Sequence, residues 1–211
     1  MVSSLIAQLQ SVTGKRYVHV GTRATHRFRK GYRYGDGEVM AAVEPGTLWE
    51  QWQVLQACVD ADGAIIMQAA NTGLTGGSTP FGTGYDRPIV IVNTLRIDRV
   101  DLIDEGRQAI CFPGATLDRL ERALRPIGRE PHSVIGSSCI GASVTGGICN
   151  NSGGSLVQRG PAYTQLSLFA QVTPERKLVL VNHLGIELGS STEEVLTRLD
   201  SGHYSQSDIQ M

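Results

Sequence analysis

The chain has 211 residues and a formal net charge of -1, with 18% charged and 41% hydrophobic residues. This length and apolar content suffice for a hydrophobic core, and the small net charge argues against intrinsic disorder. Glycine occurs 25 times without a three-residue period, which excludes a collagen-like chain, and no apolar run is long enough to span a bilayer. We expect one or two soluble globular domains, cytoplasmic because the N-terminus lacks the basic-then-apolar pattern of a signal peptide.

The apolar pattern of the first half predicts helices that alternate with strands. A short helix over residues 3–10 precedes three strands, and the continuous apolar run of the third strand indicates burial on both faces. A helix lies between the first two strands, where Thr47 and Glu50 have the spacing of a capping box. The predicted strands cover residues 39–43, 64–68 and 88–93.

The second half begins with a weak repeat of this strand–turn–helix pattern. A predicted strand over residues 108–112 is followed by Pro113-Gly114 and an amphipathic helix, as Pro45-Gly46 and a helix follow the first strand. Two paired α+β lobes with a groove between them account for this repeat. They would cover about residues 1–105 and 106–199.

Three further features complete the predicted organisation. Residues 166–172 and 177–181 flank a turn and predict a hairpin. Ser191 and Glu194 form a second capping box at the start of a helix. The last residues, 200–211, are polar and without pattern, and we expect them to form a frayed tail.

Charge is distributed unevenly along the chain. Residues 1–33 contain seven basic residues and no acidic one. This segment either forms a solvated basic face that packs against acidic segments, or attracts a phosphate-bearing ligand or an anionic membrane surface. Nucleic acid is not an expected partner, because no aromatic stacking platform or known binding module accompanies the charge.

The four cysteines show neither a CxxC pair nor metal-ligand spacing, and the five histidines form no HxH or HxxxH pair. No secretory signal suggests a disulfide framework. We therefore expect four buried thiols that act as small apolar groups, and no metal site.

Glycine is concentrated in two segments. Residues 63–84 contain six glycines and residues 136–160 contain seven, so 13 of the 25 glycines fall within 47 positions. Charged residues are absent from residues 63–85 and from residues 131–158. Both segments carry large apolar residues, which argues against flexible linkers. We expect ordered loops where the backbone approaches a ligand closely.

The first cluster, residues 68–78, directly follows a predicted strand. Its small residues let consecutive backbone N–H groups face outward as an anion nest, to which Thr72, Thr75 and Ser78 add hydroxyl groups. No GxGxxG follows a strand and no GxxxxGK[ST] occurs, which disfavours a Rossmann site or a P-loop, and a GxSxG elbow is absent. Two uncharged loops can grip one elongated cofactor such as FAD, with the pyrophosphate on one loop and the isoalloxazine ring along the other.

These motifs occur in an order that resembles a known family. The segments NTGLTGGS (residues 71–78), Pro113-Gly114 and IGSSCIGASVTGGICNNSGG (residues 135–154) resemble the PCMH-type, vanillyl-alcohol-oxidase-like FAD-binding fold. The segments REPHSVIG (residues 129–136) and SLVQRGPAY (residues 155–163) are similar to the quinone-dependent D-lactate dehydrogenases of that superfamily. The resemblance covers roughly residues 2–199.

The resemblance implies an α+β PCMH-type fold and an FAD-dependent oxidoreductase that holds FAD non-covalently. It further implies oxidation of D-lactate to pyruvate, with electrons passed to a quinone by an enzyme peripherally bound to the inner face of the cell membrane. Carried over by position, it places FAD contacts in both glycine clusters. These contacts are Ala69, Ala70, Asn71, Thr72, Gly73, Gly77 and Ser78 in the first cluster, and Gly136, Ser143 and Gly153 in the second.

Members of this family are more than twice as long as this chain. Residues 1–199 would then be the FAD-binding domain, without the family's substrate-cap and membrane-associating domains, and we expect a truncated, inactive form. The catalytic residues stay unassigned. For His132 and His183 a structural role is favoured, while Arg129 and Arg159 suit phosphate, a substrate carboxylate or a surface acid equally. Two alternatives are open: an FAD enzyme for another D-2-hydroxy acid, and a non-catalytic flavin-binding remnant.

Overall fold

The computed structural model describes residues 2–131, 136–152, 164, 166–184 and 187–208. The helices are α1 (Val2–Thr13), α2 (Thr22–Arg29), α3 (Leu48–Asp60), α4 (Leu117–Leu124), α5 (Val144–Cys149) and α6 (Thr192–Ser201). The strands are β1 (Val18–Val20), β2 (Ala41–Val43), β3 (Ala64–Gln68), β4 (Ile89–Asn93), β5 (Val100–Ile103), β6 (Gln108–Cys111), β7 (Leu168–Val172) and β8 (Leu178–Asn182). Short 3₁₀ turns lie at Lys15–Tyr17, Asp104–Gly106, Arg125–Ile127, Gly136–Ile140 and Gln206–Asp208.

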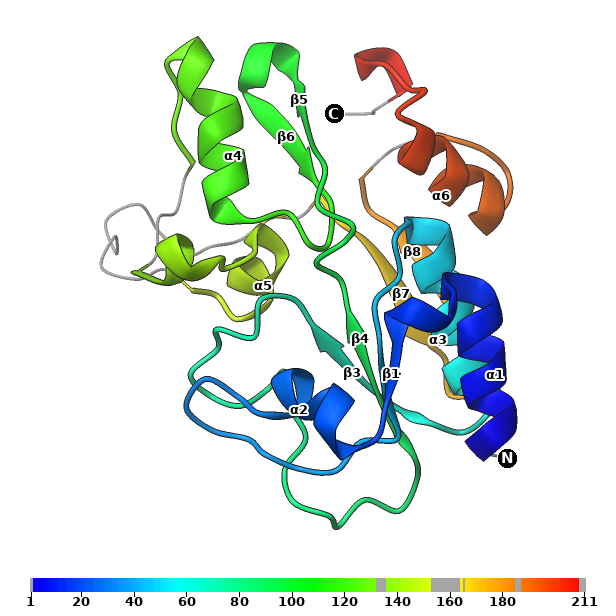
Figure 1. The fold of residues 1–211 in the computed structure, drawn as a ribbon. Helices are drawn as coiled ribbons and strands as arrows, with labels where there is room; N and C mark the ends of the chain where they lie inside the picture. Colours follow the sequence, from blue (N-terminus) through cyan, green and yellow to red (C-terminus); the bar gives the residue numbers. More distant parts are fainter. Residues whose placement is uncertain (1, 132–135, 153–163, 165, 185–186, 209–211) are drawn as a thin grey trace.

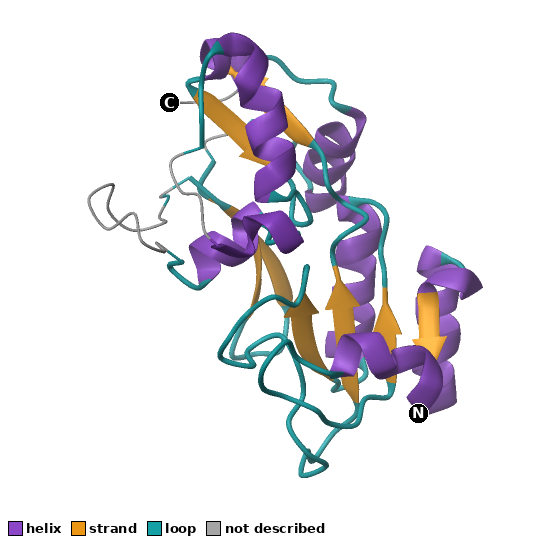
Figure 2. Cartoon of the chain, turned by 60° about the vertical axis from the view of Figure 1, so that its left-hand side comes forward, coloured by secondary structure: helices purple, strands orange, loops and turns teal. Residues whose placement is uncertain are grey.

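The largest sheet has four strands in the order β1-β2-β4-β3. Strands β2, β4 and β3 are parallel, and β1 joins β2 antiparallel at one edge (Figure 2). In the register of the parallel pair, Gln68 at the end of β3 lies beside Asn93 at the end of β4. The carboxyl ends of these two strands therefore meet at one edge of the sheet.

Both faces of this sheet are covered by helices. On one face Val90 and Val92 of β4 pack in a core cluster with Leu9 of α1 and residues of α3. On the other face Ile91 packs against Phe28 of α2. All five residues of β4 are buried, which confirms the burial on both faces predicted from its continuous apolar run.

The second half of the chain adds two antiparallel pairs of strands and the helices α4, α5 and α6. Strands β5 and β6 pair as one antiparallel hairpin, and β7 and β8 as another, the latter at the position predicted from the sequence. Figure 1 shows α4 with the β5–β6 hairpin at the end of the molecule opposite α2. The α+β class is confirmed by this mixture of helices and strands, whereas the lobe boundaries near residues 105 and 199 stay predictions.

The apolar pattern misses β1, α2 and β5, because these elements bury few apolar side chains. Helix α2 buries only Thr25 and Phe28 among its eight residues, so its apolar face is too narrow to stand out in the basic segment.

The expectation of a frayed tail is wrong for residues 200–208. Asp200 is the penultimate residue of α6, and its carboxylate accepts hydrogen bonds from Leu48 N at 2.9 Å and Trp49 N at 3.1 Å, at the start of α3. The Tyr204 hydroxyl donates to the Asp101 carboxylate of β5. Polar residues without periodicity are thus held by polar contacts, which a search for apolar pattern does not register.

The two predicted helix caps differ in detail. Ser191 and Glu194 form the complete capping box at α6. At α3, Thr47 Oγ1 accepts from Glu50 N at 3.0 Å, but the Glu50 carboxylate accepts from Gly46 N at 2.7 Å instead of from Thr47 N. The second half of that predicted box is therefore wrong by one residue.

The expectation of four buried thiols is also wrong. Cys58 is buried and Cys111 is half-buried, whereas Cys139 and Cys149 are exposed within the second glycine cluster. Burial raises the pKa of the Cys58 thiol to about 12 and that of Cys111 to about 11. In the described ranges, no helix has the length and apolar character needed to cross a membrane.

Candidate cofactor-binding site

The first glycine cluster forms a loop at the carboxyl ends of the parallel strands. The loop begins at Ala69, immediately after β3, and returns to buried positions at Thr79 and Pro80. Ligands of parallel sheets bind outside the carboxyl ends of the strands. The loop from residue 69 to residue 78 therefore lies where the topology favours a ligand site.

The backbone of this loop is asymmetric in its hydrogen bonding. Among the described residues, no backbone N–H from Ala70 to Ser78 donates a hydrogen bond. The carbonyl groups of Ala69 and Ser78, by contrast, accept from side-chain amides at 3.0 Å and 2.8 Å. A run of N–H groups without internal acceptors is the chemical requirement of an anion nest.

Two glycines of this loop have open space where a side chain would begin. A Cβ atom added to Gly73 or to Gly77 would meet no other atom within 4 Å. A residue with a side chain at either position is therefore compatible with the fold. A ligand that lies against the backbone gives a reason for glycine here that the fold itself does not, so the loop fits a pyrophosphate-bearing cofactor.

The side chains of Asn71 and Ser78 link two positions of the loop, and Asn71 also ties the loop to Lys30. Asn71 adopts a left-handed conformation with φ of 55°, which asparagine tolerates better than most residues. Its Nδ2 donates to Lys30 O at 2.8 Å, and its Oδ1 accepts from Ser78 Oγ at 2.9 Å. These two side chains shape the loop, while their backbone N–H groups belong to the row without acceptors.

Three buried polar residues under the loop were not identified from the sequence: Gln68, Asn93 and Thr94. Thr94 N donates to Gln68 O at 2.8 Å, and Thr94 Oγ1 donates to Pro113 O at 3.2 Å. It thereby ties the end of β3 to the Pro113-Gly114 turn that opens the second strand–turn–helix unit. The available signal was that an amide residue ends each of two apolar strands.

The second glycine cluster meets the first at Gly141. A Cβ atom added to Gly141, which has a φ of 93°, would lie 3.9 Å from the Cβ of Ala70. Figure 1 shows α5 between α4 and the loop that leaves β3. Leu117 N donates to Ala142 O at 2.9 Å, which fixes the cluster to the start of α4. The structure thus brings the two predicted loops together.

The predicted contacts of the second cluster have different surroundings. Ser143 is buried and caps α5, its Oγ accepting from Gly146 N at 3.0 Å. Gly136 begins the 3₁₀ turn Gly136–Ile140, and an added Cβ at Gly147 would meet open space. Gly153 lies outside the described residues.

None of the described catalytic candidates contacts the loop. His183 is exposed, and its ring packs edge-on against Phe169 with centroids 5.5 Å apart. Arg129 is exposed as well. His132 and Arg159 lie outside the described residues. The catalytic residues therefore stay unassigned.

The basic N-terminal segment is partly neutralised by acidic residues. Arg27 pairs with Glu44 at 3.0 Å and Arg29 pairs with Asp36 at 2.7 Å. These contacts support the interpretation of a basic face packed against acidic segments. The segment also adjoins the first loop, because the carbonyl of Lys30 accepts from Asn71.

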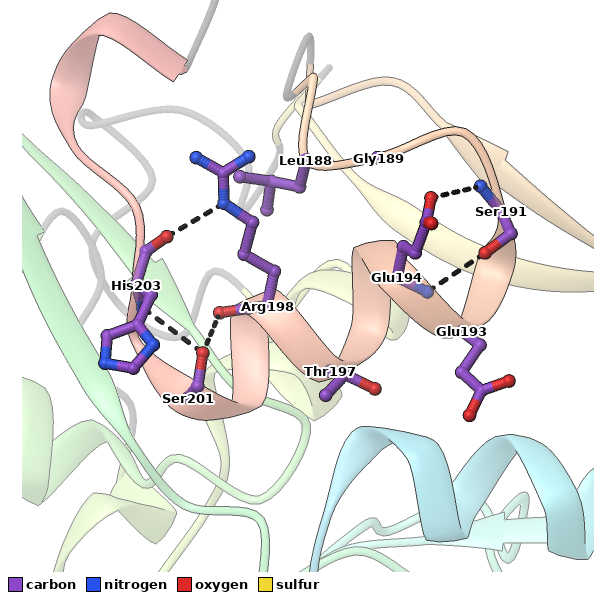
Figure 3. Close-up of a pocket in the computed structure, with 9 residues that line it drawn as sticks. All are labelled: Leu188, Gly189, Ser191, Glu193, Glu194, Thr197, Arg198, Ser201 and His203. Atoms are coloured by element: carbon purple, nitrogen blue, oxygen red, sulfur yellow. Dashed lines mark hydrogen bonds between the residues drawn. The ribbon is translucent and has the colours of Figure 1, made fainter.

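A depression of about 720 Å³ lies elsewhere, along α6 (Figure 3). Its polar groups serve the local fold: the Glu194 carboxylate accepts from Ser191 N at 3.2 Å, and Arg198 Nε donates to His203 O at 2.9 Å. No residue of either glycine cluster lines it. We therefore place the candidate site at the loops and not in this depression.

The fold is shared with proteins of known structure. The chain superposes on an alkyldihydroxyacetonephosphate synthase with a TM-score of 0.70 at 16% identity, covering 92% of this chain and 37% of that one. For a p-cresol methylhydroxylase with substrate bound, the TM-score is 0.67 at 16% identity, with the same coverage. At such low identity these likenesses show the fold alone, and they confirm the predicted PCMH-type architecture.

Sequence similarity is much higher to curated bacterial proteins. The chain is 56% identical over 208 residues to the quinone-dependent D-lactate dehydrogenase of Haemophilus influenzae, and 56% identical over 206 residues to that of Escherichia coli. These alignments cover 99% and 98% of this chain but only 37% and 36% of the relatives. The chain thus spans little more than a third of their length.

A domain family described as "FAD binding domain" matches residues 39–179. The matched range begins just before β2 and ends within β8, so it contains both glycine clusters and the parallel strands. FAD is the cofactor of this family, as predicted from the two uncharged loops. The chain belongs to the family of FAD-binding domains.

Proposed function

We propose that this chain forms the FAD-binding part of an oxidoreductase that converts D-lactate to pyruvate and passes the electrons to a quinone. The observation that carries the proposal is the loop at residues 70–78, whose backbone N–H groups have no acceptor among the described residues. The names of the relatives that are 52–56% identical supply the substrate and the electron acceptor.

In the proposed complex FAD is bound without a covalent link. The first loop would hold the pyrophosphate through Ala69, Ala70, Asn71, Thr72, Gly73, Gly77 and Ser78, and the second cluster would contribute Gly136, Ser143 and Gly153. When bound, the cofactor would supply the hydride-transfer chemistry needed to oxidise the substrate hydroxyl group. The part of this chain is to bind and orient the cofactor, with the two loops brought close to each other near Gly141 and Ala70.

We further propose that residues 1–199 act as one domain with lobes at about 1–105 and 106–199. Its partners would be D-lactate or a related 2-hydroxy acid, a quinone, and a membrane surface to which the complete enzyme binds peripherally. No nucleic acid is among them.

The test is the flavin content of the purified chain. We expect a yellow protein, or one that turns yellow with FAD, and release of intact FAD on denaturation because the bond is not covalent. A colourless protein that cannot be reconstituted would contradict the proposal. In a complete enzyme that contains this chain, anaerobic bleaching of the flavin by D-lactate but not by D-2-hydroxyglutarate supports the D-lactate assignment, and the reverse supports another D-2-hydroxy acid.

A further inference from the structure

We propose that Gln68 and Asn93 form a buried amide pair that positions the first glycine loop for a pyrophosphate; this inference rests on the proposed function. Both residues are 3% exposed and occupy paired positions at the ends of β3 and β4. Asn93 Nδ2 donates to Gln68 Oε1 at 3.1 Å. In the proposed site the two side chains act through the backbone they hold, so they are positioning residues.

Every N–H of the two side-chain amides has an acceptor. Gln68 Nε2 donates to Phe28 O and to Ser78 O, both at 2.8 Å. Asn93 Nδ2 donates to Ala69 O at 3.0 Å as well as to Gln68. Since a primary amide has two N–H groups, the donors of both side chains are fully used. Such connected buried amides are rigid and strongly specify the backbone around them.

Two of the three main-chain acceptors are the ends of the loop. The carbonyls of Ala69 and Ser78 both turn inward to the pair. In a planar trans peptide the C=O and the following N–H point in opposite directions, so the inward carbonyl of Ala69 directs the N–H of Ala70 outward. The bond to Ser78 fixes the far end. The amide pair therefore satisfies the carbonyls at both ends of the loop and directs the first N–H of the row, that of Ala70, outward.

The chemistry requires amides at these positions. Glutamate in place of Gln68 would present only acceptors to the carbonyls of Phe28 and Ser78, which would repel the loop end. Methionine would remove the donors without adding charge. We therefore expect both substitutions to weaken pyrophosphate binding, and Gln68→Glu to weaken it more than Gln68→Met.

The experiment uses the full 211-residue chain labelled with ¹⁵N and ADP as the probe, because ADP carries a pyrophosphate without the flavin ring. In the wild type, ADP should shift the amide resonances of Gly73 and Gly77. We expect Gln68→Glu to weaken binding of both ADP and FAD by about tenfold to a hundredfold. Gln8→Glu, the same change at an exposed position of α1, is the matched control and should bind like the wild type.

The amide resonances of β4 report whether each variant is folded, so a loss of the fold is distinguished from a displaced loop. Equal ADP affinity in folded Gln68→Glu and wild type would overturn the proposal. Loss of the folded spectrum in both Gln68 variants would assign the pair to folding alone and would overturn it too. If the wild type bound neither FAD nor ADP, the proposed function itself would be contradicted.

Discussion

Replacing Gly73 by valine separates the binding role of the first loop from the stability of the fold. Gly73 is exposed, and an added Cβ would meet no atom within 4 Å. We therefore expect the free energy of unfolding of the ligand-free chain to change by less than about 0.5 kcal/mol. A cofactor lying against this backbone would be displaced by the branched side chain. Loss of one hydrogen bond to a charged phosphate corresponds to about 1.5–3 kcal/mol, or roughly 10- to 150-fold in the FAD dissociation constant.

The assay is a titration of the apoprotein with FAD, followed by the quenching of flavin fluorescence, alongside urea unfolding of the same samples. Gly84→Val is the matched control, because Gly84 is also exposed with open space around its Cβ but lies beyond residues 69–78. We expect wild-type affinity in the control. An unchanged FAD affinity in folded Gly73→Val would refute the assignment of this loop to the cofactor.

Three further predictions concern groups outside the loop. In the native chain, Cys139 and Cys149 should react with a thiol reagent well before Cys58, because they are exposed and burial raises the pKa of the Cys58 thiol to about 12. Peptide mapping of the labelled protein measures the order of reaction. Asp200→Ala should lower the free energy of unfolding by about 1 kcal/mol in urea titrations, because the carboxylate caps the start of α3. The pKa of Glu194 lies below its usual range because a neighbouring backbone N–H and a serine hydroxyl donate to its carboxylate. The stabilising contribution of this carboxylate is therefore present above the usual pKa and is lost as the pH falls below about 4.3. Unfolding curves of Glu194→Gln should show a weaker dependence on acid pH than those of the wild type.

The sequence predicts elements whose stability comes from a repeated apolar pattern. The buried strands β3 and β4 and the β7–β8 hairpin lie within two residues of their predicted bounds, because each is a short apolar run with clear turn signals at its ends. The α6 capping box is predicted equally well, because its two partners are three residues apart and the hydrogen bonds are local.

Local sequence patterns do not predict the role of a residue whose hydrogen-bond partner is distant in the chain. Gln68 is bonded to Phe28, forty residues earlier, and Asp200 is bonded to the start of α3, about 150 residues earlier. Neither residue has a local neighbour that reveals its role, and each resembles an ordinary polar residue at the end of an element. The glycine clusters were found because their composition is unusual, whereas the amides that shape the first loop depend on contacts formed only in the fold.

The lack of charge in the proposed site follows from the same backbone arrangement. Residues 63–85 contain no lysine or arginine, although their proposed ligand is an anion. A long cationic side chain loses about 1.5–2 kcal/mol of conformational entropy when it is ordered, whereas backbone N–H groups are already fixed once the loop is folded. Such donors are effective only if the neighbouring carbonyls point elsewhere, which Gln68 and Asn93 achieve at the loop ends. A lysine added to the loop would therefore supply charge, but it would not restore the N–H orientation lost in Gln68→Glu.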